Sequence, residues 1–201
     1  MDELATAAQA AQEEFSAATE GSPVSPCPDG SEGFSINRAL AQVRRWLLGH
    51  FTQQNSNSCV VASSRNMIHE LTGENISEED LQQEMRELMG KPDHDFETTP
   101  INPAYAAQLL EKHGVKTQTH RNIASEDLPA TLNGKPALIG FKDPGHRVML
   151  EGVDIDEDGN RTYKVRDPDP AYGGRTREMS QEEFDAKYNP QAIVIVCERA
   201  P

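Results

Sequence analysis

The sequence is poor in cysteine, in aromatic residues and in positive charge. Its 201 residues include three cysteines, Cys27, Cys59 and Cys197, so at least one thiol has no intramolecular partner. Three cysteines without C-x-x-C spacing form neither a disulfide framework nor a typical zinc site. This use of cysteine is typical of proteins in a reducing compartment, and a disulfide between Cys27 and Cys197 is the alternative.

Basic residues are outnumbered, with 19 Lys and Arg against 33 Asp and Glu and a formal net charge of −14. Nucleic acids and anionic membranes bind through basic patches, so neither is an expected partner. No apolar run approaches the roughly 20 residues of a membrane-spanning helix, and the acidic start Met1-Asp2-Glu3 is unlike a signal peptide. We expect a chain that is cytoplasmic, or exported or delivered without a cleavable signal peptide.

The composition predicts one domain preceded by a tail. Residues 1–34 begin with an Ala-, Gln- and Glu-rich stretch and end in a segment rich in Pro, Ser and Gly, which predicts a flexible or weakly helical leader. Apolar residues recur at helical spacing from Ser35 to His50, so we place the start of the globular domain, residues 35–201, there.

Helical periodicity dominates the first half of this domain. We expect a helix from Cys59 to a stop at Gly73, one opened by a capping signal at Ser77 and running to about Met89, and one from Asn102-Pro103 to about 114.

The second half changes to strand periodicity. Strands are expected over 115–120, 136–141, 147–153, 162–166 and 192–197, with short helices near 125–132 and 180–187. Helices followed by a mainly antiparallel sheet define an α+β fold, in which the helical half packs on the sheet and a cleft between them is the natural place for a site.

Cys59 is placed like a nucleophile. Ser58 is the expected N-cap, and the free N–H groups and dipole at the helix start favour the thiolate. Gln53 lies six residues upstream, where its amide can donate to an oxyanion that forms beside the sulfur. The alternative is that Cys59 is a small buried hydrophobe, as most free cysteines are.

His146 is the candidate base. It begins a predicted strand, and a hairpin with a four-residue loop places it opposite Asp167 on the return strand; shifting the loop centre by one residue makes Asp169 the partner instead. We prefer Asp167, because pairing should end at Pro168. A histidine oriented by a carboxylate can accept the thiol proton, so Cys59, His146 and Asp167 form a predicted triad.

The other histidines are weaker candidates. His69 lies about three turns along the Cys59 helix, roughly 15 Å from its start. His50, His94 and His113 fall at element ends or in loops, and His120, which closes a strand, is a weak alternative.

One acidic run resembles a metal site. Asp154, Asp156, Asp158 and Gly159 fit the first half of a calcium-binding loop, but Val165 occupies the twelfth position, where a bidentate glutamate is required. We interpret the run as a hairpin turn and expect no metal and no cofactor.

The order glutamine, cysteine, histidine, aspartate resembles the papain-like fold, and in particular the bacteriocin-processing peptidases that remove double-glycine leaders. The resemblance covers about 50–198. It rests on Gln53, Cys59, Ala62, the strand ending at Gly152-Val153, Asp167-Pro168 and Gly173-Gly174.

The resemblance implies a thiol protease in which Cys59 is the nucleophile, His146 the general base and acid, Asp167 the orienting residue and Gln53 the oxyanion donor. Its expected partners are a protein or peptide substrate and an inhibitory or immunity protein. Secreted bacterial effectors and toxins also use compact papain-like domains with this residue order, and an acidic domain behind a low-complexity leader resembles those, so an effector or toxin role is a further expectation.

Two alternatives remain at this point. The same residues can form a thioester with a glutamine side chain, which would make the protein a deamidase or transglutaminase. A non-catalytic module that keeps the papain-like shape to bind a peptide is the other.

Overall fold

The computed structural model describes residues 50–142 and 145–201. The expectations for the leader 1–34 and for the domain start at 35 therefore lie outside the described residues, as does nearly all of the helix expected over 35–50. Everything below concerns the described residues.

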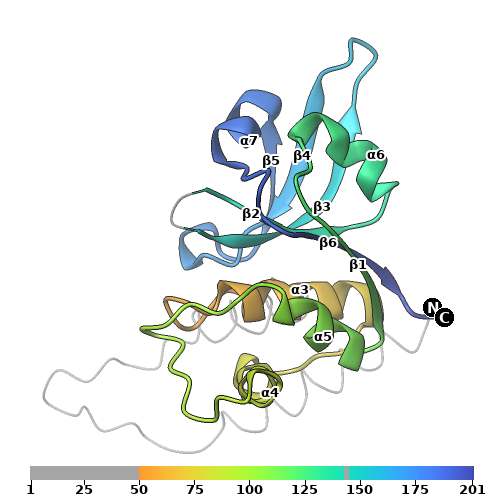
Figure 1. The fold of residues 1–201 in the computed structure, drawn as a ribbon. Helices are drawn as coiled ribbons and strands as arrows, with labels where there is room; N and C mark the ends of the chain where they lie inside the picture. Colours follow the sequence, from red (N-terminus) through yellow and green to blue (C-terminus); the bar gives the residue numbers. More distant parts are fainter. Residues whose placement is uncertain (1–49, 143–144) are drawn as a thin grey trace, which may run out of the picture. The chain divides into compact units, whose positions relative to one another are not determined.

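Three helices form the first half, as predicted (Figure 1). Helix α3, Cys59–Thr72, ends at Gly73, and α4, Glu78–Met89, follows Ser77, whose hydroxyl accepts the N–H of Asp80. The third, α5, Tyr105–Lys112, starts later than expected. Asn102-Pro103 forms a turn in front of it, in which the Tyr105 N–H donates to the Asn102 carbonyl at 3.1 Å.

The second half is a six-stranded sheet in the order β1-β6-β2-β3-β4-β5, with every neighbouring pair antiparallel. The strands are β1 Val115–His120, β2 Ala137–Gly140, β3 Arg147–Ile155, β4 Arg161–Arg166, β5 Thr176–Ser180 and β6 Val194–Arg199. Five of them confirm the predicted strands with small shifts at the ends. The edge strand β5 was not predicted, because of its five residues only Met179 is buried.

Short helices complete the chain. They are η1 Ser125–Asp127, α6 Leu128–Leu132, η2 Pro170–Tyr172 and α7 Gln181–Lys187. The 125–132 prediction thus divides into η1 and α6, and α7 carries a full capping box between Ser180 and Glu183.

Both faces of the sheet are covered, because strand residues alternate between two cores. Leu138, Met149 and Ile195 pack with α3, α4 and α5, and their neighbours Ile139 and Val148 pack with the α6 and α7 side. The helical half therefore lies on one face of the sheet, with α6 and α7 on the other (Figure 1). This is the α+β, papain-like arrangement expected.

Hydrogen bonds hold the start of α3 and the segment before it against the start of β3 and the residues that follow β4. The Ser63 hydroxyl donates to the Arg147 carbonyl at 2.9 Å, and the Gln53 N–H donates to the Pro168 carbonyl at 2.7 Å. Both Ser63 and Arg147 are buried, so the start of α3 is held against the start of β3.

No helix within 50–142 or 145–201 is both long enough and apolar enough to span a bilayer.

Candidate active site

Cys59 is the first residue of α3, as predicted, and is partly exposed. Ser58 does occupy the N-cap position, but the predicted side-chain cap is wrong. Its buried hydroxyl instead donates to the Asn55 carbonyl at 3.0 Å and accepts the Asn55 N–H at 3.1 Å. Ser58 therefore closes the loop before the helix and leaves the first N–H groups of α3 uncapped by its side chain.

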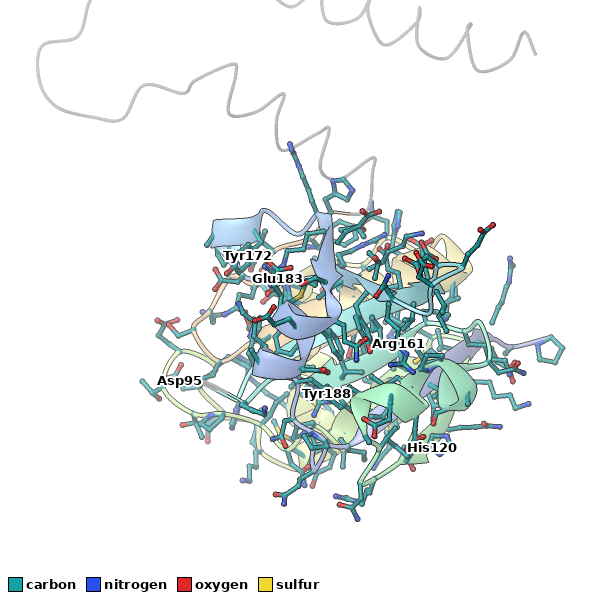
Figure 2. The ribbon with its side chains drawn as sticks, turned by 90° about the horizontal axis from the view of Figure 1, so that it is seen from above. Asp95, His120, Arg161, Tyr172, Glu183 and Tyr188 are labelled. Carbon is teal, nitrogen blue, oxygen red and sulfur yellow. The ribbon has the colours of Figure 1, made fainter. Side chains whose placement is uncertain are left out.

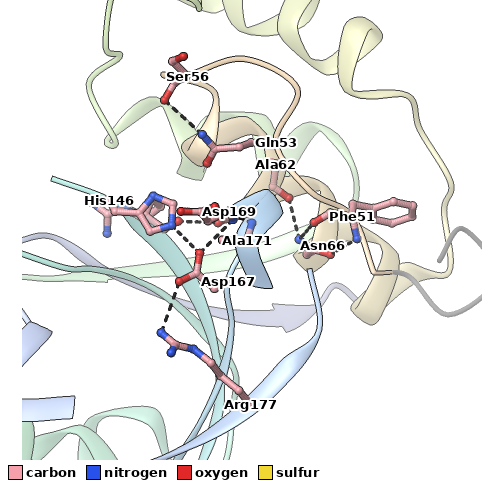
Figure 3. A network of polar contacts seen from close by, with 12 residues as sticks. Phe51, Gln53, Ser56, Ala62, Asn66, His146, Asp167, Asp169, Ala171 and Arg177 are labelled. Carbon is pink, nitrogen blue, oxygen red and sulfur yellow. Dashed lines mark hydrogen bonds and ion pairs between the residues drawn. The ribbon is translucent and has the colours of Figure 1, made fainter. Parts of the chain in front are cut away.

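His146 and Asp167 form a hydrogen-bonded pair. Nε2 of His146 donates to Oδ1 of Asp167 at 2.6 Å, and the side chains are 14% and 3% exposed (Figure 3). With Nε2 engaged, Nδ1 is the nitrogen left to interact with Cys59. The Asp167 carboxylate also accepts the Asp169 N–H at 3.0 Å and lies 3.6 Å from the Arg177 guanidinium.

The pair forms in a different register from the predicted one. Met149 pairs with Arg166, and a bulge interrupts the ladder between Leu150 and Gly152. If the pairing of Met149 with Arg166 were continued towards the start of β3, Asp169 would lie opposite His146. The chain leaves the ladder after Arg166, however, so the nearer carboxylate, Asp167, reaches the imidazole.

Asp169, the reserve candidate, has another role. Its carboxylate accepts the Ala171 N–H at 2.8 Å and so caps η2 (Figure 3). Of the two aspartates that the sequence left open, Asp167 is therefore the one whose carboxylate contacts His146.

The electrostatics couple the sulfur to the imidazole. Burial raises the pKa of Cys59, but hydrogen bonding and charge interaction with His146, followed by the backbone of Arg147, outweigh it and lower this pKa overall. Burial lowers the pKa of His146, but Asp167 and Cys59 raise it to about 9. Opposite shifts of this kind arise when a thiolate and an imidazolium favour each other's charge.

Gln53 lies beside this pair, but its amide is turned into its own loop. Nε2 donates to the carbonyls of Asn55 and Ser56 at 3.1 and 3.2 Å, while Oε1 is buried without a hydrogen-bond partner (Figure 3). The Gln53 backbone N–H donates to the Pro168 carbonyl at 2.7 Å, which fixes the loop next to the residue that follows Asp167. Donation to an oxyanion requires the amide to release one of these two carbonyls.

Helix α4 supports the Gln53 loop, and sequence reasoning missed this support. Glu78 is fully buried, and its Oε1 accepts the Gln54 N–H at 3.0 Å and an N–H of Gln82 at 3.2 Å. Gln82 also donates to the Asn55 side chain at 2.7 Å. Burial raises the pKa of Glu78 despite these hydrogen bonds.

A second carboxylate holds the loop from outside. Glu97 accepts the Ser56 hydroxyl at 2.6 Å and the Ser56 N–H at 3.1 Å. No spacing in the sequence links 97 with 56, so only the fold reveals this contact.

Arg147 is another site residue that the pattern did not single out. It directly follows His146, is 3% exposed, and donates from Nη1 to the Ile193 carbonyl at 2.6 Å. Burial lowers its pKa to about 10. Its guanidinium adds positive charge near the sulfur, which further favours the thiolate.

Among the described histidines, His146 is the one whose hydrogen bond and charge act on Cys59, and three others have different surroundings. His69 stacks edge-on against Phe51, and His113 bridges Glu74 and Glu84. His120, the weak alternative, ends β1; Figure 2 shows it well apart from Tyr172 of η2, the short helix that follows Asp167.

The acidic run after β3 is a turn, as interpreted. Asp156 accepts the N–H groups of Asp158 and Asn160 at 3.0 and 2.8 Å. In the described part of the chain, no three His, Cys, Asp or Glu side chains are grouped to hold a metal ion.

Comparisons with known proteins agree with this geometry. The Peptidase C39-like family matches residues 49–194. Among curated proteins, none matches the chain.

Solved structures resemble the chain at low identity. A double-glycine-motif protease from an AMS/PCAT transporter, crystallised with its leader peptide, has 16% identity and a TM-score of 0.55 over 75% of this chain and 90% of its own. The peptidase domain of Streptococcus ComA, a bifunctional ABC transporter, has 18% identity and a TM-score of 0.55 over 74% and 96%. The C39-like domain of a Vibrio parahaemolyticus toxin secretion protein has 14% identity and a TM-score of 0.51 over 74% and 99%.

These likenesses support the papain-like fold, and the family match covers well over half of the chain. The chain belongs to the Peptidase C39-like family and is a papain-like cysteine peptidase.

Proposed function

We propose that the protein hydrolyses peptide bonds with Cys59 as nucleophile, His146 as general base and acid, and Asp167 as the residue that orients His146. The observation that supports this most is the His146–Asp167 hydrogen bond of 2.6 Å, together with an imidazole whose interaction with Cys59 lowers the pKa of the thiol.

The proposed reaction has two stages. The Cys59 thiolate attacks the peptide carbonyl carbon, and the His146 imidazolium protonates the leaving nitrogen as the C–N bond breaks. A thioester remains on Cys59. Water then attacks it, His146 accepts the water proton, and the acid product leaves as the sulfur becomes a thiolate again.

The developing oxyanion is proposed to bind two donors, the Cys59 backbone N–H and the Gln53 side-chain amide. The Cys59 N–H is at the first position of α3, where a helix has no internal acceptor for it. For Gln53 we propose a small rotation of the amide on substrate binding, which exchanges the Ser56 carbonyl for the oxyanion.

The proposed substrate is a peptide segment of another protein. A solved neighbour with the same fold is bound to its leader peptide, which supports peptide binding by this architecture. An extended chain that passes over Cys59 and His146 would bring one of its carbonyls to the sulfur.

The test is intact-mass analysis of candidate protein and peptide substrates after incubation with the wild type, Cys59→Ala and the matched control Cys197→Ala. Fragments from the wild type and Cys197→Ala, but not from Cys59→Ala, support the proposal. A gain of one dalton without fragments would show a deamidase, and cross-linked amines a transglutaminase. Equal cleavage by Cys59→Ala would refute the role of Cys59.

The effector or toxin role stays a prediction from the sequence, as does delivery without a signal peptide. Expression inside susceptible cells tests the role: harm from the wild type that Cys59→Ala does not cause agrees with it. Harm that persists in Cys59→Ala contradicts a toxicity caused by the thiol.

A further inference from the structure

A cavity of about 280 Å³ opens beside His146, on the β2 side of β3 and so away from β4, the strand that Asp167 follows. Four strand ends meet there: Arg121 follows β1, Gly140 ends β2, Gly145 precedes β3 and Ile193 precedes β6. Asn102 of the helical half closes another side. The cavity thus adjoins the proposed reaction centre and has room for one substrate side chain with a few waters.

The lining of this cavity carries positive charge, whereas the whole chain has a net negative charge. Arg121 and Arg147 both line it, and none of its lining residues, all in the described part of the chain, is Asp or Glu. The whole sequence has 33 acidic and 19 basic residues. The two fixed charges of this lining are therefore positive in a chain that is acidic overall, and they attract anionic groups.

Arg147 is the more informative of the two. It is 3% exposed, and its Nε is buried without a hydrogen-bond partner. Among the described residues it forms no ion pair with a carboxylate, and Nη1 donates to a neutral backbone carbonyl. A buried cation that no carboxylate pairs with is costly, whereas a substrate carboxylate can accept two parallel N–H bonds from a guanidinium.

We propose that this cavity, defined by Arg121 and Arg147 beside His146, binds a carboxylate side chain of the substrate close to the scissile bond. The substrate would then be a peptide with Asp or Glu near the cleavage site. This specificity rests on the proposed function. Arg121 would attract the carboxylate from the exposed rim, and Arg147 would complete its ion pair inside.

The first experiment needs no known substrate. It compares the rates at which iodoacetate, an anion, and iodoacetamide, its neutral analogue, alkylate Cys59; in each case the thiolate displaces iodide and an S–C bond forms. Because both reagents react with the same thiolate, the ratio of the two rates cancels any change in the thiolate fraction and reports the positive charge beside the sulfur.

Arg121→Gln should lower the iodoacetate-to-iodoacetamide ratio about two- to fivefold, the size of an exposed charge interaction. Arg199→Gln is the matched control, because Arg199 is exposed at the far end of β6 and its loss changes the net charge equally. Arg147→Met, checked for folding by circular dichroism, should lower the ratio further. An unchanged ratio in Arg121→Gln and in folded Arg147→Met would overturn the proposal.

The second experiment uses peptides that the enzyme cleaves, with Glu or Gln at each position flanking the cleaved bond. We expect kcat/KM to favour Glu at one position and Arg121→Gln to reduce that preference about two- to fivefold. Cleavage without preference, or preference for Gln, would refute the inference and leave the proposed function intact. Absence of cleavage, with Cys59 no more reactive than an ordinary thiol, would instead refute the proposed function.

A third comparison separates the two sources of a carboxylate. Peptides with an internal Glu and an amidated C-terminus are compared with peptides that lack Glu and end in a free carboxylate just beyond the cleaved bond. Preference for the first set supports a side-chain pocket. Preference for the second would overturn the side-chain assignment in favour of a terminal carboxylate.

Discussion

His146 Nε2 and Asp167 Oδ1 lie 2.6 Å apart at the point where β3 begins and β4 has just ended. Each member of this pair favours the charged form of the other. The buried carboxylate keeps a proton on the imidazole, and the imidazolium in turn keeps the pKa of Asp167 below its ordinary value, even though burial raises it.

The first prediction concerns pH. An imidazolium with a pKa of about 9 should hold its proton well above pH 6.5, and the thiolate should persist below the ordinary Cys pKa of 9.0. We therefore expect kcat/KM to rise through the lowered pKa of Cys59 as pH increases, and to fall only near pH 9, when His146 loses the proton that it gives to the leaving amine.

Asp167→Asn tests why kcat/KM falls only near pH 9, which is the alkaline limb of the pH profile. The loss of the carboxylate charge should move this limb downward, towards 6.5, and reduce kcat/KM on the order of 10²-fold or more. Asp169→Asn is the matched control, because Asp169 caps η2 and makes no side-chain hydrogen bond to His146. An unshifted limb in Asp167→Asn would contradict the assigned orienting role.

The second prediction concerns the thiols. Burial raises the pKa of Cys197 to about 12, whereas the pKa of Cys59 is lowered. At pH 7 iodoacetamide should therefore label Cys59 quickly and Cys197 only after unfolding. Peptide mapping by mass spectrometry measures both rates in one sample, and Cys59→Ala identifies the fast site. Comparable rates in the folded protein would contradict thiolate activation.

The third prediction concerns the buried carboxylate of α4. Glu78→Ala removes the acceptor for the Gln54 N–H and for Gln82, and an unsatisfied buried donor costs about 1–3 kcal/mol. The free energy of unfolding should fall by about that amount in urea, and kcat should fall because the Gln53 loop loses its support. The exposed neighbour provides the control Glu79→Ala.

If Glu78 acts by positioning the Gln53 loop, its loss should leave the Cys59 thiol itself unaffected. The rate of iodoacetamide labelling at Cys59 should change little in Glu78→Ala, because the His146–Asp167 pair is elsewhere. If kcat and labelling fell together in proportion, a general loss of folded protein would explain the data instead. Glu78→Gln, which keeps one acceptor oxygen, should recover part of the activity.

The fourth prediction uses two adjacent glycines. Both Gly173 and Gly174 have φ of +66°, but a Cβ on Gly173 would meet no atom within 4 Å, whereas one on Gly174 would lie 2.6 Å from the Phe51 carbonyl oxygen. Gly173→Ala should cost about 1–2 kcal/mol for the left-handed backbone alone. Gly174→Ala should cost at least ~1 kcal/mol more, because backbone must move.

The two alanine variants also differ in their expected effect on catalysis. Gly174→Ala displaces the segment that continues into Gln53, so kcat/KM should fall, whereas Gly173→Ala should leave it nearly unchanged. Urea unfolding and peptide cleavage measure the two effects. Equal losses for both variants would show that the contact with Phe51 is unimportant.

The fold class and the candidate site could largely be predicted from the sequence, because they depend on the spacing of apolar residues and on the order of the polar residues along the chain. Helical spacing after Cys59, strand spacing after His146 and the proline that stops pairing beside Asp167 are local signals. The edge strand β5 was not accessible, since a solvated edge has no alternating pattern.

Register and side-chain direction were beyond the sequence for a different reason. The ladder between β3 and β4 contains a bulge, and its turn includes one residue more than expected; neither has a sequence signal here. Likewise, spacing placed Gln53 but could not show that its amide faces Asn55 and Ser56. The buried Arg147 and Glu78 depend on tertiary neighbours that only the folded chain brings together.

The bond from the Ser63 hydroxyl to the Arg147 carbonyl links the helix that carries the sulfur to the strand that follows the imidazole. Each half of the domain carries only part of the proposed set of groups, so the proposed activation of Cys59 depends on their association. We therefore expect that any event that moves the two layers slightly apart would abolish peptide cleavage, even though each layer would keep its own secondary structure.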